Sequence, residues 1–117
     1  MPHVVLKGNI EIENIFQNIK PIFIKDEKGI LKTLNTYIDR TKESVLFESL
    51  VLEEGKKIQF LGMISKREDG FVVRIYPSFE IEKTNGVRKI LAEMANNLLE
   101  EFPKLSIGET NLSEFLN

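Results

Sequence analysis

Residues 44–77 have the sequence SVLFESLVLEEGKKIQFLGMISKREDGFVVRIYP, and its pattern indicates the fold class. Three strand-like runs occur in it: Ser44 to Glu53, Lys57 to Ser65 and Phe71 to Tyr76. The segments EEGK and KREDG separate these runs, and the glycine in each suits a tight hairpin loop. We therefore predict an antiparallel meander over this stretch.

The alternation of side chains along these runs predicts which faces are buried. The first run carries apolar residues on both faces: Leu46, Leu50 and Leu52 on one, and Val45, Phe47 and Val51 on the other. This pattern is typical of a central strand covered on both sides. In the third run Phe71, Val73 and Ile75 share one face, and Val72, Arg74 and Tyr76 share the other. A meander with helices on one side only would leave its other face in need of a partner or a second layer.

An amphipathic helix is predicted after the meander. Apolar residues recur at helical spacing from Val87 to Phe102, and charged residues occupy the other side. Either Thr84 or Asn85 can serve as the N-cap. The helix must end before Pro103, because proline lacks the backbone donor that a helix needs.

The amino-terminal third contains a second helical pattern. The apolar residues between Ile12 and Phe23 keep helical spacing, which predicts a helix that ends or kinks at Pro21, with Asn9 as a plausible N-cap. The segment ILKTLNTYID, residues 30–39, fits a helix by its spacing and a strand by its composition, and both alternatives stay open.

The tail NLSEFLN, residues 111–117, predicts a short terminal helix, because Asn111 can cap it with Glu114 three residues later. Taken together, these patterns predict one globular α+β domain over residues 1–117. We expect its antiparallel meander to pack against an amphipathic C-terminal helix and an N-terminal helical region.

Composition excludes several classes of function. The 117 residues are 42% hydrophobic and 29% charged, with a formal net charge of -2, which argues against disorder and against phosphate binding as the main activity. There is no cysteine, so thiolate metal sites and cysteine nucleophiles are excluded, and the single histidine, His3, cannot form a histidine metal cluster. Neither a signal peptide nor an apolar run of membrane-spanning length occurs. We expect a cytoplasmic protein with no metal, no cofactor, and neither nucleic acid nor membrane as partner.

The first eight residues, MPHVVLKG, point to a specific chemistry. They resemble the start of tautomerase-superfamily proteins, particularly the 5-carboxymethyl-2-hydroxymuconate isomerase branch, which begin Met-Pro-His before an apolar strand. The order of strand 71–76, helix 84–101 and short strand 105–107 is also similar to the second β-α-β unit of that fold. The resemblance implies a homotrimer in which Pro2, freed by removal of Met1, is the general base on a small keto or enol acid, without a cofactor.

The resemblance also implies a cation that stabilises the developing enolate. Burial or a neighbouring positive charge lowers the pKa of an α-amino group from its usual value of about 8, which leaves a neutral base near neutral pH. Lys7 and Arg74 can supply the charge, and Arg74 is preferred because its planar guanidinium suits a substrate carboxylate. The predicted catalytic residues are therefore Pro2 and Arg74, with Lys7 and Tyr76 binding the substrate.

The alternative is a non-enzymatic module that self-associates or binds a partner through a face or an edge of its sheet. In this interpretation Pro2 only suits the start of an edge strand, and His3 is an ordinary polar residue. The carboxylates Glu53 and Glu54 are expected to be solvated at a turn. The two interpretations differ in whether Pro2 lies in a pocket with Arg74 or on an open edge.

Overall fold

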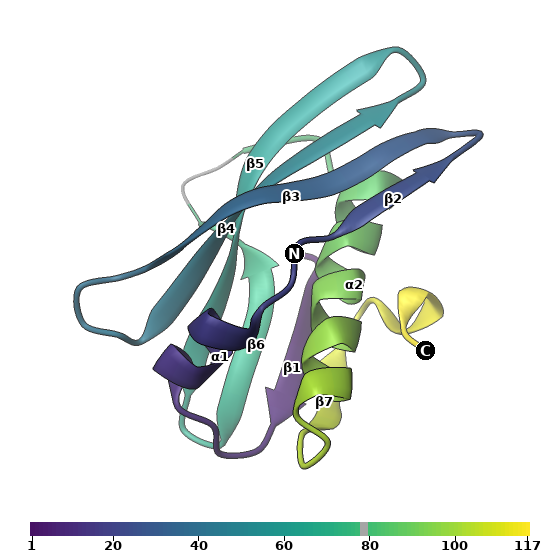
Figure 1. Cartoon of the computed structure of the whole chain (residues 1–117). Coiled ribbons are helices and arrows are strands. Elements are labelled where there is room, and N and C mark those ends of the chain that lie inside the picture. Colours follow the sequence, from purple (N-terminus) through teal and green to yellow (C-terminus); the bar gives the residue numbers. More distant parts are fainter. Residues whose placement is uncertain (78–79) are drawn as a thin grey trace.

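The computed structural model of the protein describes residues 1–77 and 80–117. Within these residues seven antiparallel strands form one sheet, in the order β2-β3-β4-β5-β6-β1-β7 (Figure 1). The strands are β1 (His3–Lys7), β2 (Phe23–Asp26), β3 (Gly29–Ile38), β4 (Ser44–Glu53), β5 (Lys56–Arg67), β6 (Gly70–Ile75) and β7 (Ser106–Thr110). Strands β2 to β6 follow one another as a meander. The first strand of the chain, β1, lies beside β6, the last strand of the meander, and β7 pairs with the other edge of β1.

The predicted meander is confirmed, and it includes two more strands than the sequence indicated. Strand β4 pairs with β5 along its whole length. The turn between them is tight, because Glu54 and Gly55 both have positive φ, 48° and 75°, a conformation that glycine adopts readily. Residues 30–39, for which the sequence left two alternatives, fall mostly in β3. Pairing with β4 on one side and β2 on the other satisfies the backbone groups of this segment as a strand.

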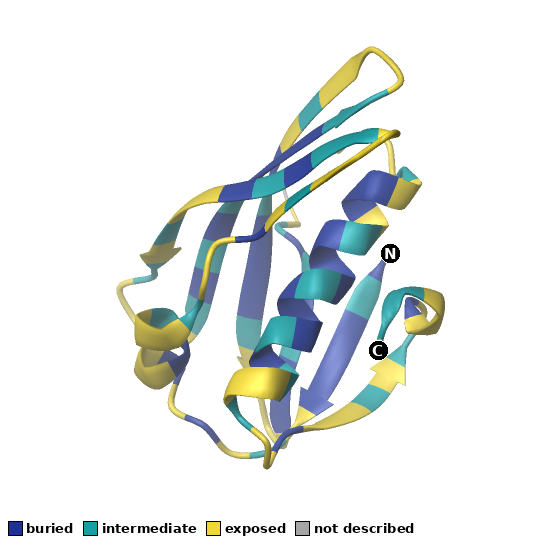
Figure 2. Cartoon of the chain, turned by 45° about the vertical axis from the view of Figure 1, so that its right-hand side comes forward, coloured by how far each residue is buried: buried dark blue, intermediate teal, exposed yellow. Residues whose placement is uncertain are grey.

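Two α-helices, α1 (Ile12–Asn18) and α2 (Asn85–Glu101), lie against the same face of the sheet (Figures 1 and 2). Helix α2 contacts β1, β3, β4 and β6, and α1 contacts β3 and β4. The start of α2 is as predicted, because the Thr84 hydroxyl accepts a hydrogen bond of 3.3 Å from the backbone N–H of Val87. This arrangement belongs to the α+β class. No helix in the described part of the chain is long and apolar enough to cross a membrane.

The hydrophobic core lies between the two helices and this face of the sheet. Side chains from α1 and α2 and from alternate positions of the strands form one buried cluster, which includes Ile15, Leu91, Val45, Phe47 and Val73. Phe47 is paired with Gly62 on β5, and a Cβ at Gly62 would meet the Phe47 ring. The glycine therefore leaves the space that this aromatic ring fills.

Two expectations about the chain ends need correction. Helix α1 is only seven residues long, with Glu11 rather than Asn9 at its N-cap, and Phe23 lies in β2 because pairing with β3 extends the chain after Pro21. The predicted short terminal helix is a three-residue 3-10 helix, η1 (Ser113–Phe115), and its N-cap is Leu112 rather than Asn111. Three apolar tail residues still pack on the core: Leu112, Phe115 and Leu116.

Candidate functional site

The two predicted catalytic residues lie near the start of β1: Pro2 directly precedes this strand, and Arg74 lies on the neighbouring strand β6. His3 is directly paired with Arg74 on β6, so the side chains of these two residues share one face. Pro2 directly precedes β1 and is buried, and by alternation it lies with Val4 on the core side. The structure therefore does not bring the ring of Pro2 and the guanidinium of Arg74 together.

The two predicted substrate-binding residues are also separated. Lys7 is exposed and pairs with Gly70 at the far end of β1. At about 3.3 Å per residue it lies roughly 16 Å from Pro2 along the strand. Tyr76 follows β6, is half-buried, and donates its backbone N–H to the carbonyl of Leu61 at 2.8 Å. Of the four predicted site residues, only Arg74 and Tyr76 are near neighbours on one face.

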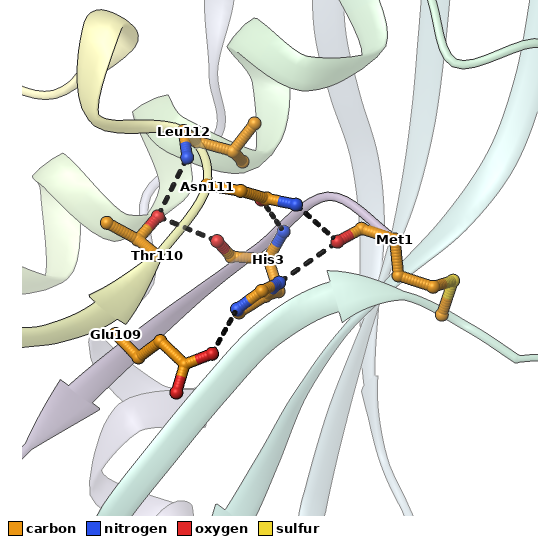
Figure 3. A network of polar contacts seen from close by, with 6 residues as sticks. All are labelled: Met1, His3, Glu109, Thr110, Asn111 and Leu112. Carbon is orange, nitrogen blue, oxygen red and sulfur yellow. Dashed lines mark hydrogen bonds and ion pairs between the residues drawn. The ribbon is translucent and has the colours of Figure 1, made fainter.

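The amino terminus is held by a network of hydrogen bonds from the end of β7 (Figure 3). The side chain of Asn111 accepts from the backbone N–H of His3 at 2.9 Å and donates to the carbonyl of Met1 at 2.8 Å. The His3 ring nitrogen Nδ1 also lies 2.9 Å from that carbonyl. Thr110 donates from its hydroxyl to the His3 carbonyl at 2.7 Å and accepts from the backbone N–H of Leu112 at 3.0 Å.

This network gives His3 and Asn111 structural roles. The side-chain amide of Asn111 makes the two hydrogen bonds that a paired backbone would make, so it extends the pairing of β7 with residues 1–3 by one position. Removal of Met1 would remove the carbonyl that the side chains of Asn111 and His3 contact. His3 Nε2 also lies 3.8 Å from the Glu109 carboxylate, which is largely exposed. The sequence assigned Asn111 to a helix cap and did not reveal this role, because its partners lie more than a hundred residues away.

The other face of the sheet carries no helix in the described part of the chain, and we call it the open face. Cross-strand register defines its members, because directly paired residues point the same way. One row runs across five strands, from His3 through Arg74, Met63 and Leu46 to Tyr37. Together with this row, the apolar residues of the open face are Val5, Phe23, Ile30, Leu50, Leu52, Leu61 and Val72. Strand β4 is thus central, as predicted, but the helices cover only one of its faces.

The open face is also rich in positive charge. Its register contains six cations: Lys7, Lys25, Lys32, Lys57, Arg67 and Arg74. The carboxylate among the paired positions of β2 to β6 is Glu48, whose Oε1 accepts hydrogen bonds of 3.2 Å from the Tyr37 hydroxyl and the backbone N–H of Asn35. A protein of net charge -2 therefore presents a cationic apolar surface on one side.

A cavity of about 180 Å³ lies near the start of α2. It is lined by Asp26, Lys28, Gly29, Leu31, Leu52, Glu53, Asn85, Gly86, Lys89 and Phe115, and includes no predicted site residue. Glu53 was expected to be solvated, but its Oε1 is buried and has no hydrogen-bond partner among the described residues. A Cβ on Gly86 would lie 2.9 Å from Glu53 Oε2, so the glycine lets the carboxylate approach the first turn of α2. A carboxylate there is favoured by the positive end of the helix dipole.

Within residues 1–77 and 80–117, no group of three or more His, Asp or Glu side chains is placed to hold a metal ion. Comparisons with family models, with curated proteins and with solved structures found no match for the chain. The resemblance of the first eight residues to the tautomerases therefore stays a prediction.

Proposed function

We propose that the protein is a non-enzymatic binding module that docks another protein on its open face. The observation that carries this proposal is the placement of α1 and α2 on one face of the sheet, while apolar residues continue across the other. Apolar residues on a sheet face that no helix covers are typical of an interaction site.

The composition of the open face is that of a protein interface. Leu46, Leu61 and Val72 are partly accessible near its middle, and long polar side chains surround them. This arrangement matches the apolar centre and polar rim of protein–protein interfaces. Tyr37 is 46% exposed and Phe23 is 64% exposed, and both lie on the β2–β3 side of this face. We place the strongest contacts there, because exposed aromatic side chains dominate many interfaces.

The geometry supports the tautomerase interpretation less well. That mechanism needs the nitrogen of Pro2 in a site with a cation, within reach of one small acid. Pro2 is buried on the core side, Arg74 belongs to the open face, and Lys7 lies at the far end of β1. A substrate molecule would have to contact groups that the sheet itself separates.

Cysteine footprinting tests the docking proposal, because the chain has no cysteine of its own. Gln59→Cys places a thiol at an exposed position of the open face, and Arg88→Cys places one at an exposed position of α2. We expect a maleimide to label both purified variants readily. In cells that express them, labelling of Gln59→Cys should be slower than in the purified protein, whereas labelling of Arg88→Cys should be unchanged.

Two results would contradict docking on the open face. The first is an equal rate of Gln59→Cys labelling in cells and in the purified protein. The second is equal protection at both positions, which would indicate that crowding rather than a docked partner shields the thiols.

A further inference from the structure

We infer that the partner docked on the open face is a protein surface with an apolar centre and acidic side chains, rather than a second copy of this chain. This inference rests on the proposed function and adds the chemistry of the partner. It follows from the positions of the cations, from their lack of ion pairs within the described residues, and from the charge that two copies would bring together.

The cations border the apolar residues at both ends of the open face. At one end Lys57, Leu52, Ile30 and Lys25 form one cross-strand row, so that a lysine stands on each side of two apolar residues. At the other end Lys7 and Arg67 flank Gly70 in the row that crosses β1, β6 and β5. Arg74 and Lys32 lie between these two ends.

Within the described residues these cations have no acidic partners. The ion pairs formed by lysine in the described residues are Lys42 with Glu13 at 3.6 Å and Lys56 with Glu82 at 3.2 Å, and both lie off the open face. None of the six open-face cations forms an ion pair within residues 1–77 and 80–117. The Nε of Arg74 is buried and has no hydrogen-bond partner there. A carboxylate from a partner would pair instead with exposed cations of this face such as Arg67, whose planar guanidinium can donate two parallel hydrogen bonds.

A second copy of the chain fits the open face poorly. In a twofold dimer the same patch contacts itself, so each cationic border would face another cationic border. Like charges in contact cost free energy unless an anion or a carboxylate separates them. With an acidic partner, the same six cations attract the partner's carboxylates. This attraction accelerates association and fixes the orientation of the complex.

Nucleic acid is also less suitable. A single-stranded chain needs a continuous cationic track beside a series of stacking aromatic rings. On the open face the apolar residues Leu50, Leu46 and Met63 lie between the cations of its two ends. The exposed aromatic residues Tyr37 and Phe23 lie on its β2–β3 side.

Defined polymers can test this chemistry with the whole chain. The probes are a random copolymer of glutamate and tyrosine, polyglutamate, a copolymer of lysine and tyrosine, and a single-stranded DNA oligonucleotide. Binding would be followed by fluorescence anisotropy and by amide NMR shifts at two ionic strengths. We expect the glutamate–tyrosine copolymer to bind best, to shift amides of β3, β4 and β5 more than those of α2, and to weaken as salt rises.

Matched charge reversals separate a local effect from net charge. Replacing Lys25, Lys57 and Arg67 together by Glu reverses three exposed cations of the open face. Replacing Lys20, Lys83 and Lys104 by Glu reverses three exposed cations elsewhere and changes the net charge equally. The affinity of the first variant for the copolymer should fall about tenfold or more, which corresponds to about 1.4 kcal/mol of binding free energy. The affinity of the second variant should fall much less. Far-UV circular dichroism would establish that both variants are folded.

The outcomes distinguish this inference from the proposed function. Equal losses in the two variants, or equal binding of the lysine–tyrosine copolymer, would overturn the acidic partner. If Gln59→Cys were still protected in cells, docking on the open face would stand with a partner of other chemistry. Displacement of the copolymer by the oligonucleotide would identify a phosphate-binding face, and concentration-dependent dimers that both charge variants retain would identify a second copy. Either result would overturn the inference.

Discussion

Met63 and Arg74 are directly paired across strands β5 and β6 on the open face of the sheet. Met63 is only 7% exposed although no helix in the described residues covers this face. The long side chain of Arg74 can shield an apolar neighbour with its stem and keep its charged end at the surface. This pair combines the two properties of the open face, an apolar interior and unpaired positive charge, in adjacent positions.

The pair of Phe47 and Gly62 should be essential for packing. Gly62→Ala introduces a methyl group into the space of the Phe47 ring, and overpacking of this kind costs about 1–3 kcal/mol in the free energy of unfolding. Phe47→Leu replaces the ring with a smaller side chain, so Gly62→Ala should cost less free energy of unfolding in the double variant. Urea denaturation of the two single variants and the double variant measures the coupling. Strictly additive costs would show that the ring and the glycine do not share this space.

Asn111 should stabilise the amino terminus. Asn111→Ala removes the acceptor for the His3 N–H and a donor to the Met1 carbonyl, and both bonds are exposed. We expect a loss of about 1 kcal/mol and faster hydrogen exchange at the His3 amide. Asn9→Ala is a suitable control, because this exposed asparagine makes no side-chain hydrogen bond within the described residues. Unchanged exchange at His3 in Asn111→Ala would contradict the network.

Asp39 should make stability depend on pH in the acid range. Slight burial raises the pKa of this carboxyl, but hydrogen bonds from the backbone N–H groups of Ser44 and Glu43 and from the Thr41 hydroxyl outweigh it and hold the pKa below its ordinary value. A lowered folded-state pKa means that the stabilisation is present above the unfolded pKa and is lost as pH falls below about 4.

The variant Asp39→Asn tests this dependence, because its side chain does not titrate. Thermal unfolding of wild type and variant should converge as the pH is lowered through this range, with wild type more stable above it. A constant difference in melting temperature from neutral to strongly acid pH would rule out the carboxylate as the source. Asp69→Asn, in the turn between β5 and β6, controls for the removal of one negative charge.

Pro2 should make no difference to enol chemistry. Because its ring lies on the core side and Arg74 lies on the other, we expect equal background rates of phenylenolpyruvate ketonisation for protein with Met1, protein without Met1, and Pro2→Ala. The assay is the change in ultraviolet absorbance of the enol, with the mass of each preparation confirmed. A faster rate for the trimmed protein, with an amine titration below about pH 8, would restore the tautomerase interpretation.

Local patterns predicted the parts of the fold that depend on neighbouring residues. The glycines of two hairpins and the spacing from Val87 to Phe102 specify β4, β5, β6 and α2 without reference to the rest of the chain. Residues 30–39 were ambiguous because pairing with β4 decides their conformation, and that pairing is not visible in the segment itself. Helix α1 ends at Asn18, before Pro21, in line with the predicted stop at that proline. The strand that begins at Phe23 was not predicted, because it depends on pairing with β3.

The candidate surface was only partly predictable for the same reason. Alternation in residues 71–76 correctly separated Arg74 from Phe71 and Val73, which are buried. The positive charge of the open face could not be anticipated, because Lys25, Lys32 and Lys57 are scattered in the sequence and only the strand register brings them onto one surface.

Site-specific photo-crosslinking in cells tests docking on the open face most directly. A photoreactive p-benzoylphenylalanine would replace Gln59 on the open face, and the same residue would replace Arg88 on α2 as the matched control. We predict that light converts the Gln59 variant into a discrete covalent adduct with one acidic protein, and that the three-site reversal of Lys25, Lys57 and Arg67 abolishes it. Adducts of equal yield and the same mass from both positions, or no adduct from Gln59, would contradict the account.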